Sequence, residues 1–266
     1  MKLFRMLSVL AALLGAHAAH AQVPRAAEIV QAEMRSGWLA ENGAHLAAVQ
    51  LRLAPGWMTY WRHPGESGLV PQLDWSGAQN VAQARIIWPE PRLYIKAGFA
   101  SIGYTGDVIL PLEITPQDPS RPVEFSATLS LGVCEEVCIP VDLGLHTVLN
   151  GRGMHDHDIA AALDRRPSAA RAAGLHHVAC SLTAEGRALR LSAQMQMPRR
   201  GIQEFLLIEL PGQPLRALPS ERIGDTLVGH SLMRVSGSPA IDRSAVRLSV
   251  VSERGTVVHQ GCAMSD

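Results

Sequence analysis

Short runs of alternating apolar and polar residues, separated by Pro, Gly and Asn, limit the folds open to this chain more than any other feature of its sequence. Such alternation turns one face of an extended strand toward a core and the other face toward solvent. The clearest runs before residue 150 are 44–53, 82–88, 107–114, 123–133 and 139–149. Many short strands between turn residues predict an all-β sandwich, preceded by a short helix at 28–36.

The sequence changes character between residues 153 and 173. Ile159, Ala162 and Leu163 recur there at helical spacing, which predicts a short helical linker. β-like runs return at 177–196, with a hairpin turn at Glu185-Gly186, and at 204–210, 226–235 and 245–251. We therefore expect two β-sandwich domains, at 22–152 and 174–266, joined by a linker at 153–173.

The first 21 residues have the pattern of a cleavable secretory signal. Lys2 and Arg5 precede an apolar run at 6–16, and Ala19-His20-Ala21 has the small-residue pattern of a cleavage site. The mature chain should begin near Gln22 in the periplasm, with no later apolar run long enough to span a bilayer. An uncleaved N-terminal anchor is the alternative.

Basic and acidic side chains are balanced in this chain, with 24 of each. Such a chain lacks the basic surface that nucleic acid or anionic lipid requires. We expect its partners to be proteins or small molecules.

Four cysteines in an exported chain suggest two disulfides. Three pairings are possible, and sequence order favours Cys134 with Cys138 and Cys180 with Cys262. Loop-closure entropy gives the first bond about 2 kcal/mol of stabilisation and the second about 4.6 kcal/mol. The short-loop bond can be opened at little cost to stability, so it is the candidate for disulfide exchange, and the long-loop bond is the candidate scaffold.

The apolar residues of 123–133 and 139–149 fall at odd positions. The even-numbered Cys134 and Cys138 should therefore point away from that core and lie at the surface, facing each other across a tight loop at 135–137. Glu135 and Glu136 lie beside the pair, and their negative charge disfavours a thiolate. Exchange would then be driven by the partner rather than by an activated cysteine.

Other interpretations of these residues remain open. The Cys134–Cys138 bond could be an inert hairpin staple in a periplasmic adaptor, or its thiolates could bind copper(I). The polar stretch at 155–158 and the pair His176-His177 have metal-ligand residue types, but a solvated polar segment explains them better. We expect no metal site and no cofactor other than a redox-active disulfide.

Several segments resemble the N-terminal periplasmic domain of the thiol:disulfide interchange protein DsbD, and more closely its relative ScsB, from suppressor-of-copper-sensitivity systems. The matching segments are PGWMTYWR at 55–62, PQLDW at 71–75, GY at 103–104, LPL at 110–112 and GVCEEVCIP at 132–140. The resemblance is strong over residues 40–150 and fainter beyond. The three residues between the cysteines match the ScsB type.

This resemblance implies immunoglobulin-like domains and a protein-disulfide reductase activity centred on Cys134 and Cys138. A thioredoxin-like or membrane protein would donate electrons, and periplasmic oxidoreductases would receive them. Phe99 would form an aromatic cap, and Tyr60 would lie beside the pair. The 266 residues contain neither the membrane domain nor the thioredoxin-like domain of full-length relatives, so we expect a separate donor protein. We expect the donor to attack Cys138, because Ile139-Pro140 follow it.

Overall fold

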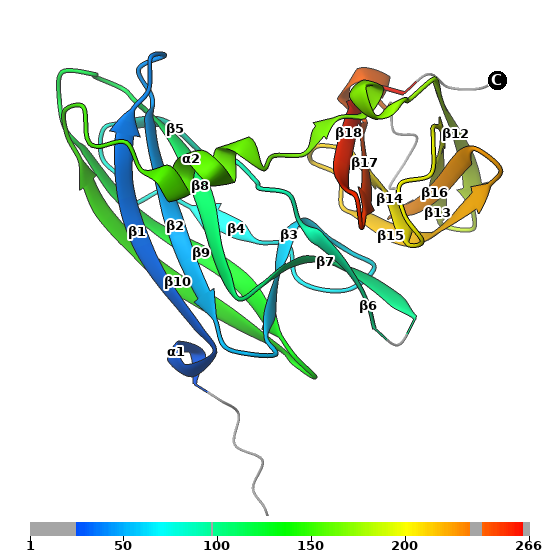
Figure 1. The fold of residues 1–266 in the computed structure, drawn as a ribbon, viewed down its shortest axis with the longest axis horizontal. Helices are drawn as coiled ribbons and strands as arrows, with labels where there is room; N and C mark the ends of the chain where they lie inside the picture. Colours follow the sequence, from blue (N-terminus) through cyan, green and yellow to red (C-terminus); the bar gives the residue numbers. More distant parts are fainter. Residues whose placement is uncertain (1–24, 97, 235–240, 263–266) are drawn as a thin grey trace, which may run out of the picture.

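The computed structural model describes residues 25–96, 98–234 and 241–262. The predicted signal segment therefore lies outside the described residues. The described chain forms four β-sheets, arranged as two sandwiches side by side (Figure 1). The predicted all-β, immunoglobulin-like fold is confirmed. No helix within the described ranges is both long enough and apolar enough to cross a membrane.

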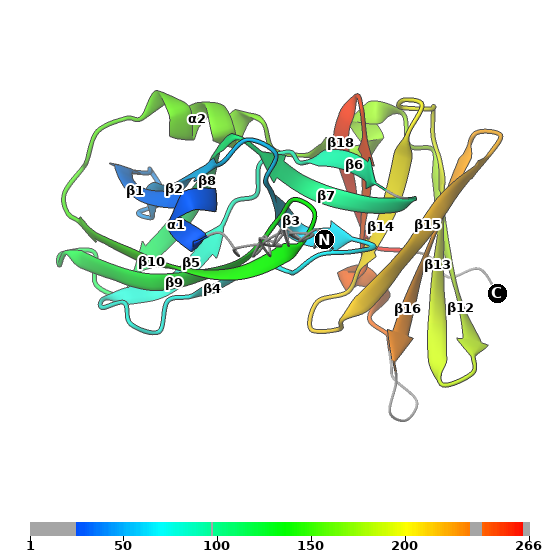
Figure 2. The same ribbon diagram turned by 90° about the horizontal axis from the view of Figure 1, so that it is seen from below.

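The first sandwich packs two sheets face to face, with β2 and β8 in one layer and β9 and β10 in the other (Figure 2). One sheet has the order β1 (Val30–Leu39), β2 (His45–Leu53), β8 (Asp107–Pro116), β5 (Val81–Ile86). The other has the order β10 (Cys138–Leu149), β9 (Val123–Cys134), β3 (Met58–Gly65), β7 (Phe99–Thr105), β6 (Arg92–Lys96), and β4 (Gln72–Asp74) also pairs with β9.

Alternating residues of these strands build the core between the two layers. Leu51 of β2, Leu112 of β8 and Phe125 of β9 are completely buried. The strands predicted from alternation are confirmed as β2, β5, β8, β9 and β10, with ends that differ by a few residues. The core therefore follows directly from the period-two pattern of the sequence.

The helix predicted at 28–36 is wrong. Only Ala26–Ile29 forms a helical turn, α1, and the chain then runs as strand β1. β1 pairs antiparallel with β2 from Val30 opposite Leu53 to Leu39 opposite His45. The apolar spacing of this segment fits either period, and the hydrogen bonds available along the edge of β2 decide in favour of a strand.

The second sandwich also has two four-stranded sheets. One has the order β11 (Ser168–Ala169), β18 (Gly255–Gln260), β17 (Arg247–Ser252), β14 (Glu204–Glu209), and the other β12 (His177–Glu185), β13 (Ala188–Gln196), β16 (Thr226–Arg234), β15 (Leu215–Ile223). The predicted hairpin is confirmed as β12–β13. A short 3-10 helix, η2 (Arg243–Ala245), precedes β17.

The segment between the sandwiches contains α2 (His157–Asp164) and a short 3-10 helix, η1 (Ala170–Ala173). α2 lies against β2 and β8 of the first sandwich, where Ile159 is completely buried. Asp156 caps the helix by accepting hydrogen bonds from the backbone of Asp158 and Ile159. Because Asp156 also pairs with Arg35 of β1, this helix is part of the first sandwich rather than a free spacer.

Strand β14 is buried on both faces, and this joins the two sandwiches. Leu206 and Ile208 belong to the core of the second sandwich. Phe205 and Leu207 point the other way and pack with the core residues of the first sandwich. A strand buried on both faces needs a continuous apolar run, and FLLI at 205–208 supplies it.

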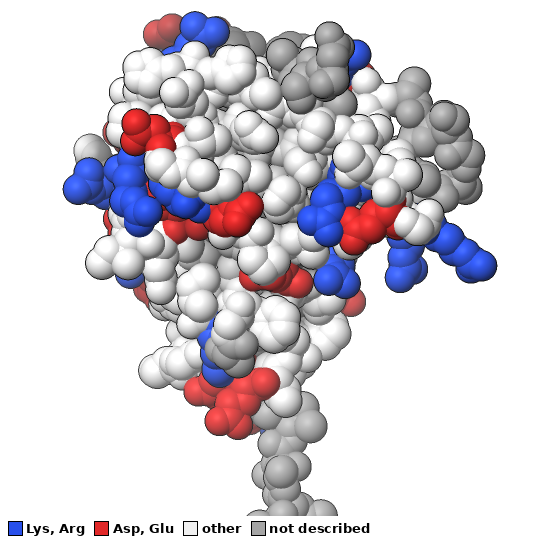
Figure 3. All heavy atoms as spheres, turned by 90° about the vertical axis from the view of Figure 1, so that its right-hand side faces the viewer, with Lys and Arg blue, Asp and Glu red and all other residues white. Residues whose placement is uncertain are grey.

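Charged side chains on the outer end of the second sandwich form small groups of mixed sign within an uncharged surface (Figure 3). Groups of mixed sign largely cancel each other's field at a distance. The described residues on this face therefore give no extended field of one sign.

Two glycines with positive φ provide a test of the β1–β2 pairing. Gly37 has φ +58°, and a Cβ there would strike the backbone carbonyl of Leu46, whereas Gly43 has φ +82° and faces open space. Gly43→Ala should lower the free energy of unfolding by about 1–2 kcal/mol through backbone strain alone. Gly37→Ala should cost about 1–3 kcal/mol more, because β1 and β2 must separate. Urea unfolding measures both, and equal losses would contradict the packing described for β1.

Candidate functional site

A disulfide closes the hairpin of β9 and β10. Cys134 is the last residue of β9, Cys138 is the first of β10, and the two are paired across the strands with a Cα–Cα distance of 4.1 Å. The three residues between them are exposed. The hairpin register thus places the two cysteines opposite each other, as expected from the alternation of the strands.

The two cysteines differ in their access to solvent. Cys138 is exposed, but Cys134 is only 4% exposed. The expectation that both cysteines lie at the surface is therefore wrong for Cys134. Both do point away from the sandwich core, but β3 pairs with β9 at this point, with Met58 opposite Cys134, and a side chain from β3 covers the sulfur.

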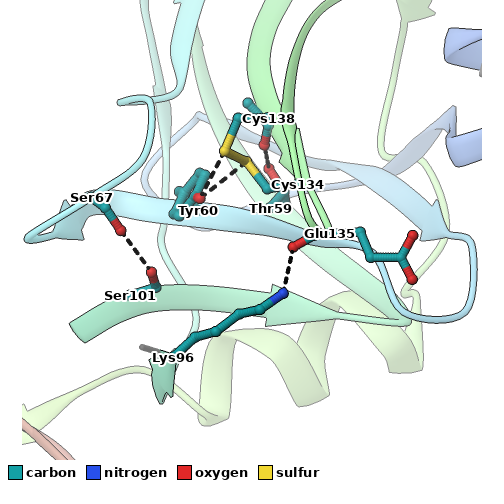
Figure 4. The surroundings of a disulfide bond; sticks show 9 residues. Thr59, Tyr60, Ser67, Lys96, Ser101, Cys134, Glu135 and Cys138 are labelled. Atoms are coloured by element: carbon teal, nitrogen blue, oxygen red, sulfur yellow. Dashed lines mark hydrogen bonds between the residues drawn. A yellow bond between two sulfur atoms is a disulfide. The ribbon is translucent and has the colours of Figure 1, made fainter. Parts of the chain in front are cut away.

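Tyr60 is the side chain that covers it. Its hydroxyl donates a hydrogen bond to Sγ of Cys134 at 3.0 Å and lies 3.4 Å from Sγ of Cys138 (Figure 4). Thr59 lies opposite Val133, and its hydroxyl donates a hydrogen bond to the backbone carbonyl of Gly132 at 3.0 Å, which fixes β3 against β9 directly before Tyr60. Burial raises the pKa of Tyr60, so its hydroxyl remains protonated and able to donate.

The hairpin of β6 and β7 contacts the loop between the cysteines through a lysine. Nζ of Lys96 donates to the backbone carbonyl of Glu135 at 2.9 Å (Figure 4). Phe99 is paired with Lys96 across this hairpin, so both side chains leave the same face. Phe99 is 58% exposed. The structure therefore places Phe99 on the face that looks toward the cysteine loop, and largely in solvent.

Lys96 is the site residue that the sequence did not reveal. It directly precedes the turn before Phe99, and its distance from Glu135 along the chain hides the contact. Glu135 and Glu136 are exposed beside the disulfide. The ammonium group of Lys96 offsets part of the negative field that these carboxylates impose on a developing thiolate.

The second disulfide has a different environment. Cys180 of β12 is bonded to Cys262, which follows β18, so the bond joins the two sheets of the second sandwich. These cysteines are 1% and 7% exposed and lie in the apolar core. A bond so enclosed offers no sulfur to a partner protein.

The polar stretch at 155–158 has structural contacts. Asp156 caps α2, and the ring of His155 lies 4.6 Å from that of Trp38. Among the residues that the structure describes, no group of three or more His, Cys, Asp and Glu side chains is placed to hold a metal ion.

Comparisons with known proteins bear on the family and the fold. Residues 26–149 match the model of a family described as thiol:disulfide interchange protein DsbD, N-terminal. No curated protein matches the chain. A solved structure, the N-terminal periplasmic domain of ScsB from Proteus mirabilis, is similar with a TM-score of 0.63 and 24% sequence identity, covering 89% of this chain and 93% of that chain. At this identity the likeness shows the fold, and it extends over both sandwiches.

The two disulfides should differ in both strength and reactivity. Replacing Cys180 and Cys262 together with Ala should cost about 4–5 kcal/mol of unfolding free energy, against about 2 kcal/mol for Cys134 and Cys138, because a longer loop is released. Limited reduction with dithiothreitol should open Cys134–Cys138 first, because Cys138 is exposed. Urea unfolding and mass spectrometry of alkylated cysteines measure the two effects. Simultaneous opening of both bonds would contradict this difference.

Proposed function

Residues 26–149 of this chain belong to the family of the N-terminal domain of the thiol:disulfide interchange protein DsbD, and on this premise we propose that Cys134 and Cys138 carry electrons between a donor protein and periplasmic client proteins. The observation that carries the proposal is the unequal pair of cysteines, with Cys138 exposed and Cys134 buried against the hydroxyl of Tyr60. Thiol–disulfide exchange needs one sulfur that can be attacked and one that leaves easily.

The first half of the exchange begins with a thiolate of the donor attacking Sγ of Cys138. The Cys134–Cys138 bond breaks, a mixed disulfide forms, and Cys134 leaves with the electron pair as a thiolate. The hydroxyl of Tyr60, 3.0 Å from this sulfur, donates a hydrogen bond to the new negative charge. Hydrogen bonds to charged groups are stronger than neutral ones. This contact therefore stabilises the leaving thiolate of Cys134 more than it stabilises the intact disulfide.

The second half completes a two-electron transfer. A second thiolate of the donor attacks its own sulfur in the mixed disulfide and releases Cys138, so the donor becomes oxidised and the pair becomes a dithiol after taking up two protons. The same steps in reverse reduce a client disulfide and regenerate the Cys134–Cys138 bond. The chain thus acts as a carrier that needs no cofactor beyond its own disulfide.

We propose the periplasm as the location of this exchange, with a thioredoxin-like or membrane protein as donor and oxidoreductases as clients. Support comes from the family of residues 26–149 and from the periplasmic domain whose fold the chain shares. The exposed apolar side chains near the pair, Phe99 at 58% and Val137 at 62%, offer a surface on which a protein partner can dock.

Trapping of partners tests the proposal. Cys134→Ala leaves the exposed Cys138 without its resolving thiol, so this variant should accumulate mixed disulfides with periplasmic proteins. Cys138→Ala leaves only the buried Cys134, and should abolish transfer and trap little. Non-reducing electrophoresis followed by mass spectrometry identifies the trapped proteins, with the Cys134→Ala/Cys138→Ala double variant as the background. No trapped protein with either variant would overturn the carrier function and favour a structural staple.

Tyr60→Phe tests the leaving-group role. Loss of a hydrogen bond to a charged group is worth about 1.5–3 kcal/mol, so the rate constant for reduction by dithiothreitol should fall about tenfold or more. Tyr94→Phe is a matched control, because its hydroxyl contacts Thr105 and neither sulfur. An unchanged rate in Tyr60→Phe would show that its hydroxyl does not assist the exchange.

A further inference from the structure

The second sandwich holds strand β3 two residues beyond Tyr60. Arg62 of β3 binds Glu209 of β14 through two hydrogen bonds of 2.8 Å each. The same guanidinium donates to the hydroxyl of Ser249 on β17 at 3.0 Å, and that hydroxyl donates to Glu209 at 3.0 Å. The side chains of Arg62 and Glu209 are only 17% and 15% exposed. A bidentate pair with so little contact with water fixes geometry as well as charge.

We call the contact of Arg62 with Glu209 and Ser249 the joint, and its charges are well defined. Burial by itself would raise the pKa of Glu209, but the hydrogen bonds and charge of Arg62 hold that pKa below its usual value, so the carboxylate is ionised. Burial lowers the pKa of the adjacent His63, so its ring is neutral at pH 7. Arg62 therefore pairs with an ionised carboxylate beside a neutral imidazole, and the charge of Arg247 also helps to keep Glu209 ionised.

Arg62 is also fixed from the side of the first sandwich. Its guanidinium stacks on the ring of Trp61, with 3.6 Å between the guanidinium carbon and the ring centroid. Trp61 is completely buried in the first core. Arg62 therefore connects the second sandwich to the strand segment that directly follows Tyr60.

The chain beyond Arg62 folds back over Tyr60. Nδ1 of His63 accepts a hydrogen bond from the backbone of Gly65 at 3.2 Å, and this begins the turn. Gly68 has φ +122°, and any Cβ there would strike the ring of Tyr60. The next residue, Leu69, packs over Gly132 of β9. The loop that covers Tyr60 therefore begins directly after Arg62, the residue that the second sandwich binds.

We propose that the second sandwich sets the reactivity of the Cys134–Cys138 bond, with Arg62 and Glu209 as positioning residues that hold β3 and its loop so that Tyr60 stays on the sulfurs. This inference rests on the proposed disulfide exchange and gives the second sandwich a part in it. It concerns the intrinsic reactivity of the disulfide, so a small thiol can test it without any protein partner.

A double-mutant cycle in the full chain tests the coupling. Glu209→Gln removes the charge that holds Arg62 and should lower the rate constant for reduction by dithiothreitol at least about threefold. In a Tyr60→Phe background the same substitution should change the rate less than about twofold, because the contact that it disturbs is already absent. A merely structural role for Glu209 predicts the same factor in both backgrounds, and that result would overturn the proposal.

Two further variants keep the test decisive. Glu90→Gln disturbs another contact between the sandwiches, the hydrogen bond from the backbone of Thr256. This variant should leave the rate unchanged, because its contact partner lies on β18 and not on β3. If Glu209→Gln fails to fold, Ser249→Ala weakens the joint without removing a charge and should show the same dependence on Tyr60. Loss of rate in Glu90→Gln equal to that in the joint variants would also overturn the proposal.

Partner trapping by Cys134→Ala is read separately, so failure of the carrier function is distinguishable from failure of the coupling.

Discussion

Strand β3 places three consecutive side chains in three different environments, and the site depends on this. Tyr60 faces the disulfide, Trp61 is buried in the first core, and Arg62 reaches the second sandwich. Regular alternation along a strand places side chains on two faces only. The pairing between β3 and β7 is interrupted after Tyr60, so Arg62 need not follow this alternation. One short strand thereby links the sulfurs, the core and the neighbouring domain.

Loop length and burial together distinguish the two disulfides of this molecule. The Cys134–Cys138 bond has a sequence separation of 4 and includes the exposed residue Cys138, whereas the Cys180–Cys262 bond has a separation of 82 and lies between two sheets. Opening the first bond costs little stability because the loop that it closes is short, and the strands on either side are paired along their whole length without it. The hairpin can therefore change its redox state while the sandwich remains folded.

Much of the fold could be read from the period-two pattern, but strands without a clean pattern could not. β9 and β10 were predictable because their odd residues are apolar throughout. β3 carries Tyr, Trp, Arg and His in succession, so hydropathy does not show its two faces. The apolar spacing of β1 fits a helix as well as a strand, and only the neighbouring edge of β2 decides its conformation. The role of β14 as the strand shared by both cores also depends on what lies on each side of it.

The sequence by itself determined the identity and spacing of the cysteines and the face of the strands on which they lie, and it favoured the pairing that closes the hairpin, because alternation and loop length are local properties of a chain. Only the tertiary structure decided that Cys134 is covered and Cys138 is open, that Lys96 reaches the loop between them, and that Arg62 meets Glu209. These contacts join residues separated by 39 to 147 positions, and their geometry exists only once the strands have paired and the two sandwiches have packed together.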